Sequence, residues 1–316
     1  MLDRVRLFSE LEDSRRILIA GAGGGFDVYA GVPLYAALRR RGCEVFFGNL
    51  TFTHLGAVKA ETLTPACMEI SATTRGPDGY FPERSLAAFL SAQGLGTRVF
   101  AFDNAGVVAV REAYAHLVDE LQLDTIVLVD GGTDILMRGD EQGLGTPGED
   151  MTSLAAVARV DVARKVVCCL GFGVDAFHGV HHAQFLENVA SLSRRDGYWG
   201  AFAVTADMPE AQLYLAAVAH AAEQTKRRSI VNGSIADAIE GKYGDVHRHP
   251  ERTRNSTLWI NPLMAMYWSF DLAAVVVEHL YLDDLMDATS ASEVFARISA
   301  ARYRIPRREG PLQIPV

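Results

Sequence analysis

The feature that most constrains the fold is an alternation between short apolar runs and longer segments with a helical apolar repeat. Most of the short runs are continuous rather than alternating, which is typical of strands covered on both faces. The expected strands are residues 16–21, 44–49, 98–103, 125–130, 165–172, 200–205 and 256–261.

The segments between these runs show the apolar spacing of helices. Strand–helix alternation of this length predicts βαβ units. We therefore expect an α/β fold: a doubly wound, mainly parallel sheet of about six or seven strands with helices on both faces, a Rossmann-like three-layer sandwich. The expected helices are residues 31–42, 106–122, 149–160, 208–227, 264–280 and 290–302.

No internal repeat, low-complexity tract or Pro/Gly-rich linker divides the 316 residues. We therefore expect a single domain over residues 1–316. Two irregular stretches, near 50–80 and 241–255, are interpreted as insertions at the rim of the sheet.

Composition narrows the classes of partner. The formal net charge is −9 and the basic residues form no long cluster, which argues against nucleic acid or an anionic membrane. The four cysteines include no CxxC pair, and the longest apolar runs are too short to span a bilayer. We expect a cytoplasmic protein that binds a small molecule, and association into a homo-oligomer stays open.

Glycines and polar residues follow nearly every expected strand. The carboxyl ends of parallel strands lie on one edge of an open sheet, and ligands bind in the crevice there. Turn and helix-capping roles account for about half of these positions, but not for loops this rich on nearly every strand. The pattern predicts a small-molecule site at this edge.

The first such loop, "GAGGGFD", runs from a strand into a helix. Gly23, Gly24 and Gly25 allow close backbone approach, so successive N–H groups could hold an anion or cofactor beside Asp27. Phe26 interrupts the GxGxxG spacing and GxxxxGK[ST] is missing, which argues against a standard dinucleotide site or P-loop. The alternative is a tight turn with Asp27 as helix cap.

Acidic residues crowd the loop after the fourth expected strand, in "VLVDGGTDILMRGDE". Clustered carboxylates repel one another unless a cation or shared protons compensate, and their oxygens bind hard divalent ions. We expect Asp130, Asp134 and Asp140 to bind a divalent cation or polarise substrate hydroxyls, with Asp134 also catalytic. Arg138 either binds a substrate carboxylate or phosphate or pairs with a neighbouring acid. Gly131, Gly132 and Thr133 complete the expected ligand-binding residues of this loop.

The segment "GTPGED" that follows has the signature of a helix start. Thr146 is expected to cap the helix and Pro147 to occupy its first position. Glu149 and Asp150 would favour the positive end of the helix dipole. Both acids are therefore assigned to structure rather than to the site.

Histidines crowd the loop after the fifth expected strand, in "GVDAFHGVHHAQF". If a helix begins near His178, then His178, His181 and His182 share one of its faces. Imidazoles beside a carboxylate suit a transition metal, with His178 and His182 as ligands. Alternatively His178 or His181 is a general base held by Asp175.

A smaller signal is Asn104 in "DNAG" after the third expected strand. Its amide could hydrogen-bond a substrate, and a turn role explains it equally well.

The motifs GGGFD after the first strand and DGGTDxLMxGDExGLGTPxED after the fourth resemble the family called domain of unknown function 1152. The resemblance spans most of the chain and implies a Rossmann-like α/β protein. The family has no established activity, so it implies no catalytic role for any residue.

The leading hypothesis is a small-molecule enzyme with its site at the carboxyl edge. Metal-assisted hydrolysis or a related transfer on a phosphorylated or nucleotide-like compound fits the candidate residues best. One alternative is a nucleotide- or cofactor-binding transferase or oxidoreductase without a catalytic metal. The other is a non-catalytic sensor that binds a metabolite at the same edge.

Overall fold

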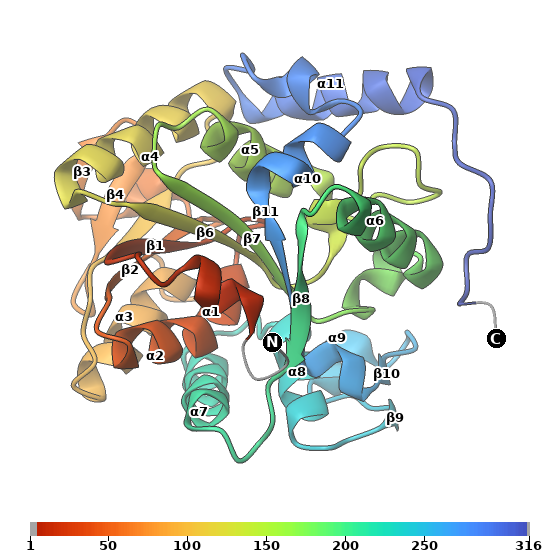
Figure 1. Ribbon diagram of the computed structural model, residues 1–316. Coiled ribbons are helices and arrows are strands. Elements are labelled where there is room, and N and C mark those ends of the chain that lie inside the picture. Colours follow the sequence, from red (N-terminus) through yellow and green to blue (C-terminus); the bar gives the residue numbers. More distant parts are fainter. Residues whose placement is uncertain (1–4, 315–316) are drawn as a thin grey trace.

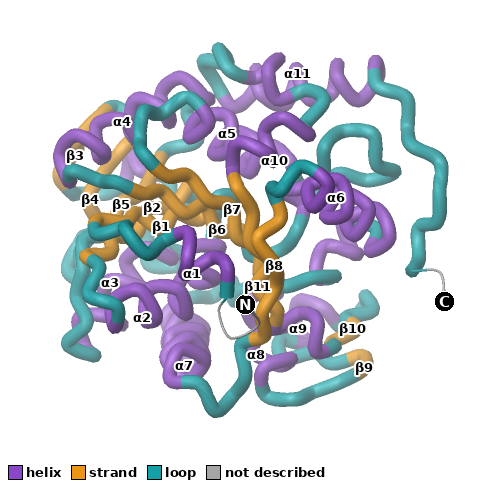
Figure 2. Tube along the Cα trace, viewed as in Figure 1, coloured by secondary structure: helices purple, strands orange, loops and turns teal. Residues whose placement is uncertain are grey.

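The computed structural model describes residues 5–314, in which a nine-stranded sheet lies between two layers of helices (Figures 1 and 2). The strand order is β3-β4-β5-β2-β1-β6-β7-β11-β8, and β9 pairs with β10 in a separate two-stranded sheet. The α/β class and the helix-covered, mostly parallel sheet are as predicted. The strands are β1 (Arg16–Gly21), β2 (Glu44–Leu50), β3 (Glu61–Thr64), β4 (Cys67–Ile70), β5 (Val99–Phe102), β6 (Thr125–Asp130), β7 (Arg164–Leu170), β8 (Tyr198–Ala203), β9 (Gly244–Asp245), β10 (Trp259–Ile260) and β11 (Met266–Asp271).

Helices connect the strands and cover both faces of the sheet. One group, α2, α3 and α7, lies on one face, and α4, α5, α10 and α11 lie on the other (Figure 1). The α-helices are α1 (Arg6–Glu10), α2 (Val32–Arg40), α3 (Pro82–Ala92), α4 (Val107–Leu121), α5 (Pro147–Ala158), α6 (His182–Arg194), α7 (Pro209–Gln224), α8 (Ile230–Ile239), α9 (Pro250–Thr253), α10 (Leu272–Glu278) and α11 (Ala291–Arg304). The 3-10 helices are η1 (Asp27–Gly31), η2 (Leu55–Ala57), η3 (Asp134–Leu136), η4 (Val174–His178), η5 (Pro262–Ala265) and η6 (Leu282–Leu285).

Strand β1 shows why the apolar runs are continuous. Leu18 and Ala20 belong to the core under α4 and α5, whereas Ile17 and Ile19 belong to the core under α2 and α7. Because successive side chains of a strand point to opposite faces, a strand covered on both faces needs apolar residues at every position.

At the centre of the sheet, the order in which successive strands are added reverses direction. Strand β1 pairs in parallel with β2 on one side and with β6 on the other. The chain leaving β1 enters η1 and α2 on one face, and the chain leaving β6 leads to α5 on the opposite face. Such a switch point opens a crevice at the carboxyl ends of the two strands.

The sheet is larger than the expected six or seven strands. Residues 61–64 and 67–70, inside the expected rim insertion near 50–80, form the hairpin β3–β4, and β4 pairs antiparallel with β5. These strands are only four residues long and mostly half-exposed, so they lack the continuous apolar run that marks a covered strand.

The expectations for residues 256–280 were wrong in two respects. The expected strand 256–261 contributes only β10 to the small sheet, and the expected helix 264–280 contains β11 and the shorter helix α10. Strand β11 lies antiparallel between β7 and β8. Because residues 264–277 are apolar at nearly every position, periodicity does not separate strand from helix here, and the break is made by Asp271, whose Oδ1 accepts from the N–H of Ala273 (3.2 Å).

Between residues 5 and 314, no helix combines the length and the apolar character needed to cross a bilayer. Helices α1, α3, α8 and α9 had no counterpart in the sequence-based expectations, and α6 begins four residues after the helix start considered at His178.

Candidate functional site

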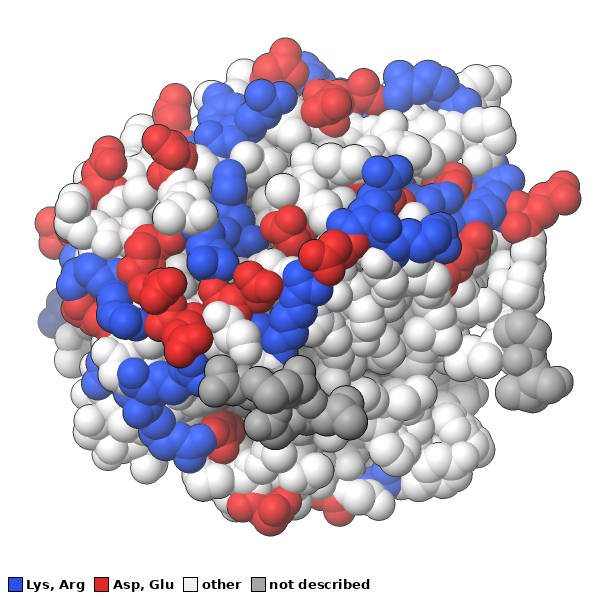
Figure 3. All heavy atoms as spheres, viewed as in Figure 1, with Lys and Arg blue, Asp and Glu red and all other residues white. Residues whose placement is uncertain are grey.

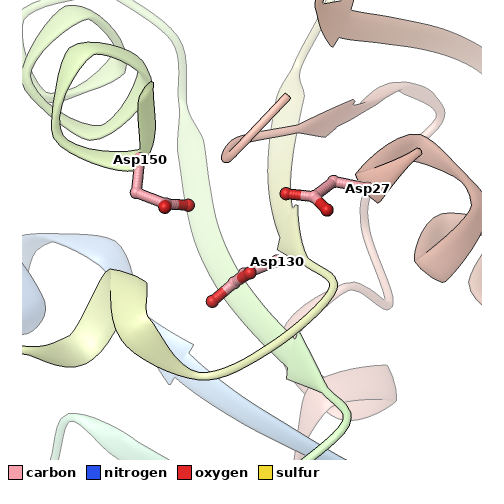
Figure 4. A group of neighbouring side chains, drawn as sticks. All are labelled: Asp27, Asp130 and Asp150. Atoms are coloured by element: carbon pink, nitrogen blue, oxygen red, sulfur yellow. The ribbon is translucent and has the colours of Figure 1, made fainter. Parts of the chain in front are cut away.

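Three carboxylates meet in the crevice between β1 and β6, and we call Asp27, Asp130 and Asp150 the acidic trio. One carboxylate oxygen from each lies within 4.8 Å of the others. In Figure 4, Asp27 and Asp150 point toward each other across the end of β6, from which Asp130 projects. The trio therefore joins three segments that are far apart in the sequence: the start of η1, the last residue of β6 and the first turn of α5.

The glycine-rich loop shapes the space around Asp27. The backbone N–H groups of Gly23 and Gly131 lie beside the Asp27 carboxylate and favour its ionised form, which acts to lower its pKa. A Cβ at Gly23 would lie 2.5 Å from Asp27 Oδ2 and 2.9 Å from Asp150 Oδ1, so only glycine fits there. Gly24 and Gly25 adopt φ of 87° and 62°, a left-handed conformation that favours glycine.

Two buried amides fix the far end of this loop. Asn49 Nδ2 donates to the carbonyl of Gly25 (2.8 Å), and Asn232 Nδ2 donates to the carbonyl of Phe26 (3.0 Å). These bonds come from β2 and α8, so the loop is held from both sides before any ligand binds.

Asp150 is the most unusual member of the trio. Asp150 is only 1 % exposed to solvent. No hydrogen-bond partner for its Oδ1 is found within residues 5–314. An unpartnered buried carboxylate oxygen is costly, so it needs a proton, a water or a cation beside it.

Burial and mutual repulsion make this cluster hard to ionise completely. Burial raises the pKa of Asp27 to about 8, with a further contribution from the charge of Asp134. Burial also raises the pKa of Asp130 and Asp150 well above the usual range, and their main charged neighbours are other carboxylates. A divalent cation would remove the cost of ionising the three groups together.

Asp134 and Asp175 lie next to the trio and have partners of their own. Asp134 Oδ2 accepts from Thr146 N (2.7 Å) and Oγ1 (3.1 Å), so the Thr146 hydroxyl serves Asp134 rather than capping α5. Asp175 Oδ2 accepts from Thr133 N (2.7 Å). Burial raises the pKa of both carboxyls, and each interacts electrostatically with the trio.

Close backbone packing allows these contacts. A Cβ at Gly132 would lie 2.4 Å from Asp175 Oδ2, and one at Gly145 would lie 2.2 Å from Asp134 Oδ2. Gly131, Gly132 and Thr133 are therefore brought to the site.

Asp140 and Arg138 are not brought to the trio. Arg138 donates to both oxygens of Asp140 (3.0 and 2.8 Å) and also pairs with Glu278 (3.3 Å). Burial alone would raise the pKa of Asp140, but its pairing with Arg138 and Arg308 leaves it below the usual value. Arg138 was expected either to bind a substrate anion or to pair with a neighbouring acid, and in the structure it pairs with Asp140.

The expected shared face of three histidines does not form. Helix η4 ends at His178, Gly179 takes φ 86°, His181 is the N-cap of α6 and His182 is its first residue. The left-handed glycine turns the chain between His178 and His182, so they lie on different elements.

The remaining candidates lie outside the acidic trio. His178 is exposed, and its positive charge would lower the pKa of Asp134. His182 packs on Phe172 with ring centroids 5.1 Å apart, and burial lowers its pKa. Asn104 follows β5, two strands away from β1.

Sequence reasoning assigned Asp150 to the helix start, which accounts for its position but not for its surroundings. Pro147 is the first residue of α5, as expected, and Asp150 lies in the first turn. Leu154 and Val157, four and seven residues later, are fully buried. Asp150 therefore lies on the apolar stripe of the helix, and a carboxylate at such a position is the sequence feature that could have indicated a site residue.

Fold and site together define the class: a doubly wound α/β protein with a buried carboxylate cluster at the switch point of its sheet. The chain belongs to the family described as protein of unknown function DUF1152, whose sequence profile matches residues 18–303. This confirms the resemblance carried by the two loop motifs.

Among solved structures, the chain is similar to Dbv21, the deacetylase of the antimicrobial A40926 pseudoaglycone. The TM-score is 0.42 with 15% sequence identity, covering 82% of this chain and 98% of that one. No curated protein matches the chain.

Proposed function

We propose that this protein is a small-molecule enzyme whose acidic trio holds a divalent cation. The proposed reaction is metal-assisted hydrolysis, or a related transfer, on a phosphorylated or nucleotide-like compound. The observation that carries the proposal is the unpartnered, buried Oδ1 of Asp150, on a carboxylate that has an oxygen within 4.8 Å of carboxylate oxygens from two other segments.

The donor set favours a hard cation. All three groups of the trio are carboxylates, and such oxygens suit Mg²⁺, Mn²⁺ or Ca²⁺ better than the softer metals that prefer imidazole or thiolate. The trio contains no histidine. When bound, the cation would polarise a substrate oxygen and lower the pKa of a water molecule.

The neighbouring residues supply the rest of the proposed chemistry. Asp134 is anchored through one oxygen by Thr146 and is the proposed proton acceptor beside the trio. His178, at the exposed end of η4, is the proposed proton donor at the mouth of the crevice.

The test is cation binding by wild-type protein and by the variants Asp150→Asn and Glu149→Gln. Titration with Mn²⁺, followed by electron paramagnetic resonance, should show one tight site in wild type. Asp150→Asn should weaken that site by about a hundredfold or more, because a direct ligand matters more than an outer-shell partner, whose loss costs 10- to 100-fold.

Glu149→Gln is the matched control, since it removes the same charge from the neighbouring residue on α5. Because its charge acts on Asp27 and Asp150 only through space, its loss should change Mn²⁺ affinity far less than Asp150→Asn does. Equal affinity in wild type and Asp150→Asn, or no Mn²⁺ binding by wild type, would refute the cation site. With the site established, Mn²⁺-dependent release of phosphate from a panel of nucleotides and sugar phosphates tests the reaction.

A further inference from the structure

A cavity of about 540 Å³ shares one wall residue, Phe26, with the glycine-rich loop. The segment 72–78, helix α3 and helix α7 surround it, and Phe26 forms part of its wall. The next residue is Asp27, so one loop borders both the cavity and the trio. The volume lies in the range of about 300–1,000 Å³ that is usual for small-molecule sites.

The wall of this cavity is rich in hydrogen-bond donors and in positive charge. Arg75, Arg84 and His220 line it, and Asp78 is its single carboxylate among the lining residues. The side chain of Asp78 is 99% exposed and pairs with Arg84 only at 3.6 Å, so it neutralises little of this charge. The hydroxyl and amide groups of the wall come from Thr73, Thr74, Ser85, Gln224 and Thr225.

Two of the nitrogen-bearing side chains of the wall, Arg84 and His220, are held in place by the fold. Arg84 lies over the ring of Phe81 (5.1 Å) and donates to the carbonyl of Pro77 (3.2 Å). His220 Nδ1 lies 3.4 Å from Ser85 Oγ, and its ring packs against Phe89. Preorganised donors of this kind reduce the entropy lost when an anion binds.

Arg75 differs from these two because it is uncommitted. It is exposed, and no residue in the described part of the chain forms an ion pair with its guanidinium. A free guanidinium beside a cavity can bind a phosphate or carboxylate through two parallel hydrogen bonds.

The acidic trio offers no positive charge to an anionic substrate, because all three of its members are carboxylates. A substrate that carries an anionic group therefore needs positive charge from elsewhere, and the cavity wall that contains Phe26, Arg75 and Arg84 supplies it.

We propose that this cavity binds the phosphate or carboxylate group of a small molecule through Arg75, Arg84 and His220. The further step, that this molecule is the substrate whose other end reaches the acidic trio, rests on the proposed function. The anion site itself does not, because none of its residues belongs to the trio.

The experiment measures binding of inorganic phosphate and of malonate, separately and in the presence of EDTA, by the dependence of the melting temperature on ligand concentration. The proteins are wild type, Arg75→Gln and Arg159→Gln. Arg159 is the matched control, because it is an exposed arginine at the carboxyl end of α5, outside the cavity. Wild type should be stabilised by phosphate, by malonate or by both, which identifies the favoured anion.

Arg75→Gln should bind the favoured anion about tenfold more weakly, the loss expected for one charge-assisted hydrogen bond. Arg159→Gln should match wild type. No stabilisation by either anion, or equal affinity in Arg75→Gln, would overturn the anion site. Asp150→Asn should bind the anion as wild type does. The experiment therefore distinguishes a wrong anion-site proposal from a wrong cation-site proposal.

Discussion

Asp27 is the partly accessible member of the acidic trio, and its protonation couples the cluster to pH. Its pKa is raised to about 8 in the folded protein, from an ordinary value near 4. Between these two values the folded state binds more protons than the unfolded state. The contribution of this group to the free energy of unfolding is therefore complete below about pH 4 and is lost as pH rises to about 8.

The corresponding prediction concerns Asp27→Asn in metal-free buffer. Relative to this variant, wild type should lose several degrees of melting temperature between pH 5 and pH 8, since only wild type must ionise the Asp27 carboxyl. Mn²⁺ at pH 8 should restore wild type and leave Asp27→Asn unchanged. Parallel melting curves of the two proteins across this range would contradict the role given to Asp27.

At the same scale, the sequence revealed some site residues and concealed others. Asp130 could be found because it ends an apolar strand, and Asp27 because it follows one within a short loop. Asp150 could not be separated from an ordinary first-turn acid without considering the apolar stripe it shares with Leu154. Pairing partners such as Arg138 with Asp140 depend on side-chain directions that spacing does not determine.

Among the elements, the central strands were predictable and the outer ones were not. Strands β1 and β6 begin and end at the expected residues, because each is an apolar run covered on both faces. Strands β3 and β4 are short and mostly half-exposed, and β11 continues into the apolar helix α10. Their pairing partners are distant in sequence, and local pattern contains no information about such partners.

Helix α11 and the segment after it fix the loop that follows η3. Arg308, whose side chain is 11% exposed, pairs with the fully buried carboxylate of Glu141 (3.3 Å). Arg302 donates to the carbonyls of Gly139 and Glu141, both at 2.8 Å. This loop begins three residues after Asp134, so the C-terminal elements support the site from outside.

We expect Arg308→Ala to destabilise the protein by about 3 kcal/mol, because it leaves the buried Glu141 carboxylate without its charged partner. Arg304→Ala is the control: its pair with Asp284 is exposed, and its loss should cost less than about 1 kcal/mol. Urea denaturation measures both. Losses of equal size would show that Arg308 has no special structural role.

For the whole molecule, the described residues form two large apolar cores on opposite faces of one sheet, and a third, smaller cluster contains Leu55, Ile70 and Phe81. On the face in Figure 3, Lys and Arg side chains lie interspersed with Asp and Glu rather than in a separate basic patch. The acidic trio lies at the switch point between β1 and β6. The helix layers on both faces of the sheet therefore contribute residues to it, Asp27 from η1 and Asp150 from α5.

A single domain over residues 1–316 is still a prediction, and calorimetry can test it. We expect one unfolding transition with a van't Hoff enthalpy close to the calorimetric enthalpy, because β1 and β6 contribute side chains to both cores. Two unfolding transitions whose midpoint temperatures move apart when the scan rate or the urea concentration is changed would contradict this expectation.

The position of β11 has a consequence for biosynthesis. Strand β8 does not pair with β7, because β11 lies between them. Until residues 266–271 have left the ribosome, the N–H and C=O groups along the edge of β7 are unpaired and can pair with another nascent chain. Truncated products that stop short of this point should therefore aggregate and depend on chaperones.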